Sequence, residues 1–321
     1  MIGRNRNAFC VVRPPGHHAG VKGLLAGGES CGFCIFNSVA AGAMHAISEE
    51  KLLCERCAIV DIDVHHGNGT EEIVRKCHDP GKLFFFSIHL YDNGGKGKSA
   101  QYKFYPGTGD EDDVALNIIN VPITPLWKEK DPSPSVSTTH NTRHRARQTR
   151  SKKSDDSDSS DAETFVSSGT STPTTPNVAS TTSGRIAYRR AIQNRLLPSL
   201  RAFNPDLILI STGFDACKGD VGNAKHEIGG KERVGLDLEP EDYAWTTRKI
   251  MEIADICCQG RVVSVLEGGY GKTPLQTSDD DDSNLPLDKS MFSECAVRHI
   301  HAMIDPYDVE ARFRNSSRSD S

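Results

Sequence analysis

The stretch that most constrains this chain is residues 58–72, AIVDIDVHHGNGTEE, where a short apolar run ends in two aspartates and two histidines. Side chains alternate along a β-strand, so we expect Asp61, Asp63 and His65 to project to one face. Buried like charges are very costly unless a cation neutralises them. Aspartates that cap a helix or face water are the alternative, which the HHGNG that follows makes weaker. The stretch therefore predicts a metal site at a strand end.

A second histidine pair, His17 and His18, lies in the turn sequence RPPGHHAG at residues 13–20. Paired histidines can move protons near neutral pH. One such pair is more often a packing or surface detail, but a second pair on a carboxylate-rich strand favours a shared chemical site.

Two other apolar runs also end in polar residues. Residues 205–212 lead to Asp215, and residues 262–266 lead to EGGYG, which contains Tyr270. With helix-like stretches between the runs, this pattern predicts a parallel α/β sheet whose site lies at the carboxyl ends of the strands. Two carboxylates and an imidazole leave an open position on a four- or five-coordinate metal, as in catalytic zinc sites.

Hydrophobic periodicity predicts the other elements. Further strands are expected at residues 9–12, 83–89 and 117–121, and helices at residues 36–51, 186–203, 241–258 and 295–304. Residues 221–239 should form a loop, and Pro198 should kink the helix that contains it. The helix at residues 36–51 has apolar residues at helical spacing that we expect in the core: Val39, Ala40, Ala43, Met44 and Ile47.

The chain has 321 residues, a formal net charge of -5 and ten cysteines. Its length allows one large α/β domain or two small ones, and its charge gives no global nucleic-acid signature. No stretch approaches the length of a bilayer-spanning helix, and residues 1–12 lack the apolar core of a signal peptide. We therefore expect a soluble intracellular protein without a membrane partner, whose cysteines stay reduced.

One cysteine arrangement matches the spacing of a four-cysteine zinc site. Cys31 and Cys34 form one CxxC pair, and Cys54 and Cys57 form the other. The helix expected between the pairs would hold its ends roughly 20 Å or more apart. We therefore reject a zinc ion shared by these four cysteines.

Composition changes sharply over residues 128–184, where Ser, Thr, Pro and charged residues replace large apolar ones. Such a segment cannot bury enough surface to order itself, so we expect a disordered insertion. Its basic residues 143–153 could be a nuclear localisation signal or a nucleic-acid contact. The alternative is a solvated loop in which they pair with the acidic residues 154–163. A shorter polar insertion at residues 273–290 and a disordered tail at residues 309–321 are also expected.

Seven motifs follow one another along the rest of the chain: RPPGHHAG (13–20), GFCIFN (32–37), DIDVHHGNG (61–69), FSIHLYD (86–92), FYPGTGD (104–110), STGFDA (211–216) and LEGGYG (266–271). In these motifs the chain resembles a zinc-dependent histone deacetylase of the class II type, in the arginase/deacetylase superfamily. The resemblance implies an α/β, arginase-like three-layer fold with a central parallel sheet flanked by helices. The active site would lie at the carboxyl ends of the strands, in one catalytic domain spanning residues 1–308.

The resemblance also implies roles for single residues. The implied zinc ligands are Asp63, His65 and Asp215. The implied catalytic residues are His17 and His18, which handle protons, their partners Asp61 and Asn68, and Tyr270, the hydroxyl donor to the oxyanion. The implied substrate-binding residues are Phe33, Tyr105, Gly268 and Gly269. A structural potassium ion is implied at Asp61, Ser87 and Ile88.

The implied reaction is zinc-dependent hydrolysis of the acetyl group from N6-acetyl-lysine in histones or other proteins, which releases acetate. Tyrosine rather than histidine at Tyr270 favours turnover. Two alternatives stay open: an acetylpolyamine amidohydrolase of the same fold, and a catalytically silent acetyl-lysine reader or scaffold. Only sixteen residues precede His17, so we expect the domain to be truncated at its N-terminus relative to the family pattern.

The resemblance implies partners and a location as well. Acetylated histone tails or other acetyl-lysine proteins would be substrates, and a corepressor complex is a candidate partner. Nucleic acid would be contacted only through residues 143–153. We expect the protein in the nucleus, with shuttling to the cytoplasm as the alternative.

Overall fold

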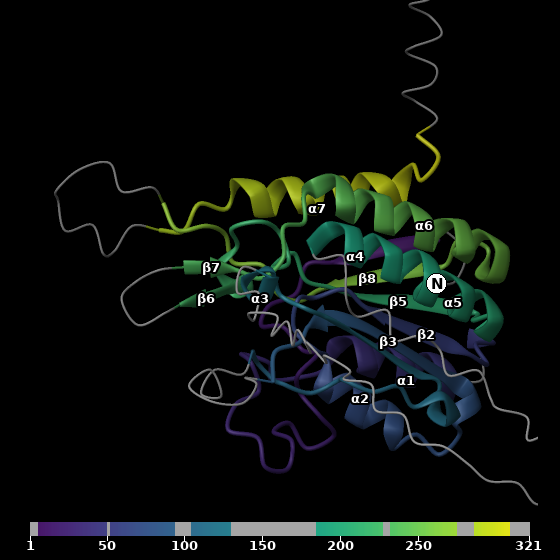
Figure 1. Ribbon diagram of the computed structural model, residues 1–321. Helices are drawn as coiled ribbons and strands as arrows, with labels where there is room; N and C mark the ends of the chain where they lie inside the picture. Colours follow the sequence, from purple (N-terminus) through teal and green to yellow (C-terminus); the bar gives the residue numbers. More distant parts are fainter. Residues whose placement is uncertain are drawn as a thin grey trace, which may run out of the picture. The chain divides into compact units, whose positions relative to one another are not determined.

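Six parallel strands form the central sheet of the part of the chain that the structure describes (Figure 1). This computed structural model describes residues 6–49, 52–93, 104–129, 184–226, 232–274 and 286–308. The strands are β1 (Asn7–Cys10), β2 (Cys57–Asp61), β3 (Leu83–Leu90), β4 (Ile118–Ile123), β5 (Leu207–Thr212) and β8 (Val262–Leu266). They lie in the order β1-β8-β5-β2-β3-β4, which confirms the predicted parallel α/β sheet.

Helices cover both faces of the sheet, which is the middle of three layers (Figure 1). Helices α1 (Ser38–Ser48) and α2 (Asn68–Arg75) lie on one face. The other face carries α4 (Gly184–Ala191), α5 (Leu197–Phe203), α6 (Pro240–Cys258) and α7 (Ser290–Ile304). In β2, Cys57 and Ile59 pack into the core with α1 and α2, whereas Ala58 and Val60 pack into the core with the other helices. Because both faces are buried, such strands are continuously apolar.

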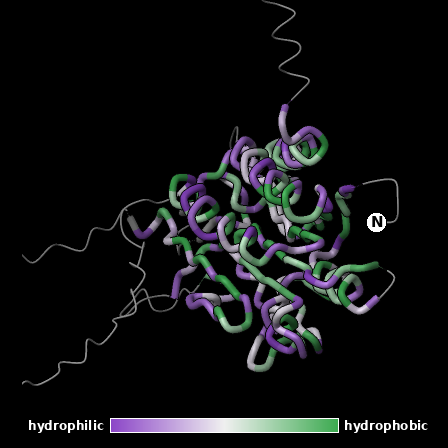
Figure 2. The backbone as a smooth tube through the Cα atoms, turned by 90° about the vertical axis from the view of Figure 1, so that its right-hand side faces the viewer, coloured by the Kyte–Doolittle hydropathy of each residue, from purple (hydrophilic) through white to green (hydrophobic). Residues whose placement is uncertain are grey.

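Helix α1 is shorter than predicted and begins after Asn37, whose side-chain oxygen accepts a hydrogen bond from the Ala40 N–H at 3.0 Å. This cap satisfies one of the free donors at the helix start. Val39 and Ala43 are buried, whereas Met44 is 37% exposed, so its predicted core position is wrong. Met44 follows Val39 by five residues, which rotates it by roughly 140° from Val39, to the flank of the buried stripe. Figure 2 shows helices that alternate between hydrophilic and hydrophobic residues, as expected for helices with one buried face.

The helix predicted at residues 186–203, which Pro198 should kink, contains a widened turn just before this proline. Between α4 and α5 the chain makes the five-residue π-helix η5 (Ile192–Leu196). A proline ring clashes with the carbonyl group four residues earlier, which here belongs to Asn194 within the π segment. We infer that the wider turn gives the ring room while Leu196 and Leu200 stay buried.

Other elements also differ from the prediction. β1 ends at Cys10, and α7 begins at Ser290, five residues before the predicted start. The predicted loop at residues 221–239 contains a short hairpin of β6 (Ala224–His226) and β7 (Glu232–Val234), preceded by the 3-10 turn η6 (Val221–Asn223). The remaining short elements are η2 (Pro80–Lys82), η4 (Val114–Leu116) and α3 (Leu126–Glu129).

The chain divides into two units, Met1–Asp131 with Thr181–Ser321, and Pro132–Ser180. The second unit lies outside the described residues. Apart from their margins, so do the insertions predicted at residues 128–184 and 273–290 and the tail at residues 309–321. Their disorder stays a prediction. Across the described ranges, no helix combines the length and apolar character needed to cross a membrane.

Candidate active site

The site begins where β2 ends. The strand stops at Asp61, so Asp63 and His65 lie on the bend that follows, and the prediction that strand alternation orients all three is wrong. Hydrogen bonds shape the bend instead. Asp61 Oδ1 accepts the Asp63 N–H at 3.1 Å, and Asp63 Oδ1 accepts the His65 N–H at 2.8 Å. Each carboxylate thus holds the backbone two residues further on, as in an Asx turn.

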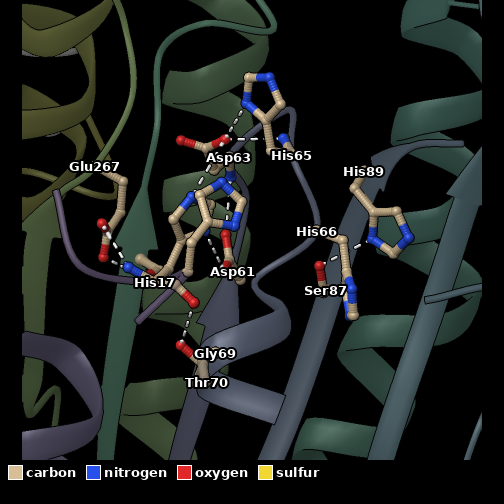
Figure 3. A network of polar contacts seen from close by, with 12 residues as sticks. His17, Asp61, Asp63, His65, His66, Gly69, Thr70, Ser87, His89 and Glu267 are labelled. Atoms are coloured by element: carbon tan, nitrogen blue, oxygen red, sulfur yellow. Dashed lines mark hydrogen bonds and ion pairs between the residues drawn. The ribbon is translucent and has the colours of Figure 1, made fainter. Parts of the chain in front are cut away.

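Three potential metal ligands meet at this bend. His65 Nδ1 lies 3.1 Å from Asp63 Oδ1 and 3.1 Å from Asp215 Oδ2, and the ligand atoms of the three residues lie within 4.8 Å of one another. Asp63 and Asp215 are buried, and Figure 3 shows Asp63 beside His65. Burial and then the charge of Asp63 raise the pKa of Asp215. One imidazole nitrogen cannot supply two carboxylates with a proton each, so the donor set fits a divalent cation with oxygen and nitrogen ligands, such as zinc.

The two histidines of the first motif lie beside these ligands with different partners. His17 Nδ1 is 2.9 Å from Asp61 Oδ2, and His18 Nδ1 is 2.8 Å from Asn68 Oδ1. Burial acts to lower the pKa of His17, but the charges of Asp61 and Asp63 raise it well above its usual value. Burial and then the positive charge of His17 lower the pKa of His18 well below its usual value. Near neutral pH, His17 therefore carries a positive charge and His18 is a neutral base.

The turn after β8 brings Tyr270 to the same place. The Gly268 N–H donates to Asp63 Oδ2 at 2.8 Å, and a Cβ at Gly268 would collide with the Asp63 and Asp215 carboxylates. Gly269 has a φ of +118°, which a side chain would strain. Both glycines thus support the backbone around the metal ligands. Burial and then the charges of Asp215 and Asp63 raise the pKa of Tyr270 well above its usual value, so the phenol keeps its proton.

Asp220, which the sequence reasoning missed, holds the Tyr270 turn. Its Oδ2 accepts the N–H groups of Tyr270 at 2.9 Å and Gly271 at 2.7 Å, and its Oδ1 accepts the Gly222 N–H at 2.9 Å. Asp220 is 3% exposed. A buried carboxylate that binds three backbone donors fixes the turn, and with it the position of the phenol. The only sequence signal was its place five residues after Asp215.

Asp220→Ala is expected to lower kcat by about 10- to 100-fold, because the Tyr270 hydroxyl is no longer held in place. Activity on an acetylated substrate measures the effect. In a Tyr270→Phe background, adding Asp220→Ala should cost little more, because the hydroxyl that it positions is already absent. Independent, additive losses in the double variant would contradict a positioning role.

A pocket of about 240 Å³ opens onto these groups. Its lining residues are Pro15, His17, His18, Ser30, Gly32, Phe33, His65, Tyr105, Gly268 and Tyr270. The Tyr105 ring meets His18 edge-on at 4.8 Å between centroids, and its hydroxyl donates to the Ser30 carbonyl at 2.9 Å. Phe33 is 76% exposed, so it forms the outer wall. Phe104, which the sequence reasoning missed, stacks on His65 with centroids 5.0 Å apart.

A second polar network anchors the loop at residues 104–110, which carries these aromatic residues. His66 Nδ1 lies 2.8 Å from Thr108 Oγ1, and His66 Nε2 lies 2.9 Å from Glu71 Oε2. His89 Nε2 lies 2.9 Å from the carbonyl oxygen of the glycine after Thr108. In Figure 3, His66 and His89 lie next to each other, apart from His17, Asp61 and Asp63. His66 therefore links the loop at residues 104–110, which carries part of the pocket wall, to Glu71 on α2.

Glu71→Gln is expected to remove a pH-dependent part of the free energy of unfolding. Burial acts to raise the pKa of Glu71, but His66, Asn120 and Arg75 together lower it from 4.5 to about 2. Because the folded-state pKa lies below the unfolded-state value, ionised Glu71 stabilises the fold on the order of 2 kcal/mol above pH 4.5. This stabilisation is lost as the pH falls toward 2.

Denaturant unfolding of both proteins at about pH 6 and about pH 3 measures this difference, which should shrink at the lower pH. Glu294→Gln, on the exposed face of α7, removes a carboxylate whose ion pair with Arg298 at 2.8 Å is exposed, and as the control it should change the free energy of unfolding at about pH 6 by less than about 1 kcal/mol. A destabilisation by Glu71→Gln that is equal at both pH values would refute the assignment.

The residues implied for a potassium site are neighbours, but the contacts of the described residues do not test the ion. Asp61 pairs with Ser87 across β2 and β3. Ser87 Oγ lies 2.9 Å from His89 Nδ1, and the Ile88 side chain packs in the core. A structural potassium ion here stays a prediction.

Among the described residues, only one other group could hold a metal through three side chains: His17, Cys34 and Glu267. Sequence reasoning missed it, because Glu267 stood out only as the residue before two glycines. Neither group includes Cys31, Cys54 or Cys57.

Comparison with known proteins places the chain in a family. The histone deacetylase domain matches residues 1–281. The chain is 34% identical over 315 residues to type-2 histone deacetylase 1 of Dictyostelium discoideum, covering 94% of this chain and 18% of that protein. It is 30% identical over 318 residues to type-2 histone deacetylase 2 of the same organism, covering 97% of this chain and 13% of that protein. The chain thus spans less than a fifth of the length of these relatives.

A crystal structure of the HDA15 HD domain superimposes with a TM-score of 0.54 at 24% identity, over 94% of this chain and 57% of that one. This likeness shows the fold, and it agrees with the six-stranded parallel sheet flanked by helices. The expected arginase-like α/β fold is therefore confirmed. With the domain match over residues 1–281, these findings show that the chain belongs to the histone deacetylase family.

Proposed function

We propose that this chain is a zinc-dependent protein lysine deacetylase, which hydrolyses the acetyl amide of N6-acetyl-lysine and releases acetate. The observation that carries the proposal is the convergence of Asp63, His65 and Asp215 within 4.8 Å of one another. His65 faces the same pocket as a neutral histidine, His18, and a protonated phenol, Tyr270. A hydrolase of this family needs the metal ligands, a neutral histidine and a phenol donor around one amide.

Zinc held by Asp63, His65 and Asp215 would polarise the acetyl carbonyl and lower the pKa of a bound water. The part of His18 follows from its hydrogen bond. Because Asn68 Oδ1 accepts from His18 Nδ1, the neutral ring carries its proton there and leaves Nε2 free as a base. His18 Nε2 then takes a proton from the attacking water and returns it to the lysine nitrogen as the amide bond breaks.

Two other side chains complete the reaction. The Tyr270 hydroxyl donates a hydrogen bond to the substrate oxygen as negative charge develops on it, which stabilises the transition state. His17 is held by Asp61 and stays positively charged, so it offsets the carboxylates of this buried site. His17 and His18 thus have different roles, set by their different partners.

The pocket supports an acyl-lysine as the substrate. Phe33 and Tyr105 offer aromatic faces to an aliphatic stem, and the polar groups lie at the inner end beside His65. A long, neutral acyl-lysine side chain matches that division between apolar walls and a polar end. We propose acetylated histone tails or other acetylated proteins as substrates, within a corepressor complex. We also propose nuclear entry through residues 143–153, which lie outside the described residues.

Activity and zinc content on the same purified protein test the proposal. We expect about one tightly bound zinc ion and faster acetate release from an acetyl-lysine peptide than from an acetylpolyamine. Faster hydrolysis of the polyamine would indicate an acetylpolyamine amidohydrolase instead. Peptide binding with zinc bound but without acetate release would indicate a silent reader or scaffold.

A further inference from the structure

We infer that His17, Cys34 and Glu267 form a second, inhibitory site for a divalent transition-metal ion such as zinc. One potential ligand atom of each residue lies within 4.8 Å of the others. The three residues are buried, with exposed fractions of 2%, 6% and 0%. They come from separate segments, the turn after β1, the loop before α1 and the end of β8, so the fold itself brings them together.

The donor atoms are those that zinc prefers. An imidazole nitrogen, a thiolate sulfur and a carboxylate oxygen are all regular zinc ligands, and the sulfur favours zinc or cobalt over magnesium or calcium. Three protein ligands leave a fourth position for water. The site of Asp63, His65 and Asp215 has no sulfur, so the two sites differ in a way that spectroscopy detects.

Two of the three side chains are already oriented for a metal. His17 Nδ1 lies 2.9 Å from Asp61 Oδ2, so the ion would bind Nε2 and displace the proton that the charged ring carries there, giving the carboxylate–histidine–metal arrangement common in zinc sites. Glu267 Oε2 accepts the Gly16 N–H at 2.7 Å and the His17 N–H at 3.1 Å. Its Oε1 accepts one hydrogen bond, from Ser211 Oγ at 2.6 Å, and so keeps a free lone pair.

Burial raises the pKa of the Cys34 thiol to about 11, so the ion itself must displace the thiol proton when it binds. The Cys34 sulfur accepts the His18 N–H at 3.4 Å, and its own S–H reaches the Gly32 carbonyl only at 3.6 Å. A thiol is a weak donor, so releasing this proton to solvent forfeits one long contact. The thiolate that remains is the form that binds metals.

An ion at this site would interfere with the proposed reaction. His17 lines the pocket, and His17 Nε2 lies 3.7 Å from Asp63 Oδ1. The ion would therefore occupy His17 and add positive charge next to the first metal. That this inhibits deacetylation rests on the proposed function, whereas binding does not.

Cobalt binding to the metal-free protein tests the site without an activity assay. We expect wild type to bind two Co²⁺ ions and to show a thiolate-to-cobalt charge-transfer absorption. Cys34→Ser should bind one ion without this absorption, whereas Cys77→Ser, a control at a partly exposed cysteine after α2, should behave as wild type. Wild type that binds one ion without the absorption, or an absorption that survives in Cys34→Ser, would overturn the inference.

Glu267→Gln keeps the thiol and covers the case in which Cys34→Ser fails to fold. It should retain the first ion and bind the second about tenfold or more weakly. Unchanged affinity for the second ion would overturn the site as described.

Zinc inhibition then connects the site to activity. Zinc beyond one equivalent should inhibit wild type, and Cys34→Ser should need about tenfold or more zinc for the same fractional inhibition. Equal zinc sensitivity would contradict the inhibitory role. A protein that binds two cobalt ions but releases no acetate would instead refute the proposed function and leave the second site standing.

Discussion

Tyr270→Phe is expected to lower kcat on an acetyl-lysine peptide by about 10²-fold or more, with little change in KM, because it removes one donor to the developing oxyanion. The variant keeps the ring, which packs near Phe33 with centroids 6.2 Å apart. Burial and then the charges of Asp215 and Asp63 keep the Tyr270 hydroxyl protonated, so the lost group is a true donor at neutral pH. Steady-state release of acetate measures both constants.

A matched control separates this loss from a general effect of removing a hydroxyl. Tyr307 lies beyond the end of α7, and its hydroxyl donates to Asp255 at 2.6 Å, outside the pocket. Tyr307→Phe should therefore leave kcat unchanged. A Tyr270→Phe enzyme with a kcat within about twofold of wild type would exclude the phenol from the chemistry.

Asp215→Asn is expected to weaken zinc binding by more than about 100-fold and to abolish deacetylation at limiting zinc, because a neutral amide replaces a charged ligand. The fold should persist. Asn has the same shape, and its side-chain oxygen can still accept the Val64 N–H that Asp215 Oδ1 accepts at 3.0 Å. Zinc content after dialysis and acetate release measure the two effects.

Stability distinguishes lost metal binding from misfolding in this variant. Burial and the charge of Asp63 raise the pKa of Asp215, so the carboxylate destabilises the metal-free fold. Metal-free Asp215→Asn should consequently unfold at the same or a higher denaturant concentration than metal-free wild type. Asp255→Asn, at an exposed position of α6, is the control and should bind zinc normally. Full zinc content in Asp215→Asn would remove Asp215 from the ligand set.

The metal ligands could be found in the sequence, although the geometry assumed there was wrong. Asp63 and His65 stood out because two carboxylates and two histidines follow an apolar run. Strand alternation does not orient them, since β2 ends at Asp61. Their convergence depends on hydrogen bonds to backbone N–H groups within the bend, and composition and periodicity do not reveal such contacts.

The residues that sequence reasoning missed act through contacts between distant segments. Asp220 matters because it accepts a hydrogen bond from the Tyr270 N–H. Glu267 matters because its carboxylate accepts a hydrogen bond from the Gly16 N–H, in the turn that carries His17. Neither belongs to a local pattern of metal ligands. Phe104 was read only as part of an aromatic loop, and its stacking on His65 depends on the fold.

The sheet was more predictable than the helices. Central strands such as β3 are buried on both faces and therefore appear as uninterrupted apolar runs. Helix faces depend on which side meets the sheet, and Met44 fell on the exposed flank despite its helical spacing. Likewise, Pro198 predicted a kink, but not the π-helix that precedes it.

Zinc titration of the metal-free protein, with acetate release from an acetyl-lysine peptide as the readout, tests most directly whether Asp63, His65 and Asp215 hold the ion that the reaction needs. For wild type, we predict negligible acetate release without zinc and a maximum at one equivalent. The Asp215→Asn protein should stay inactive across this range. Full activity in the metal-free wild type, or an Asp215→Asn protein restored by one equivalent of zinc, would contradict this assignment.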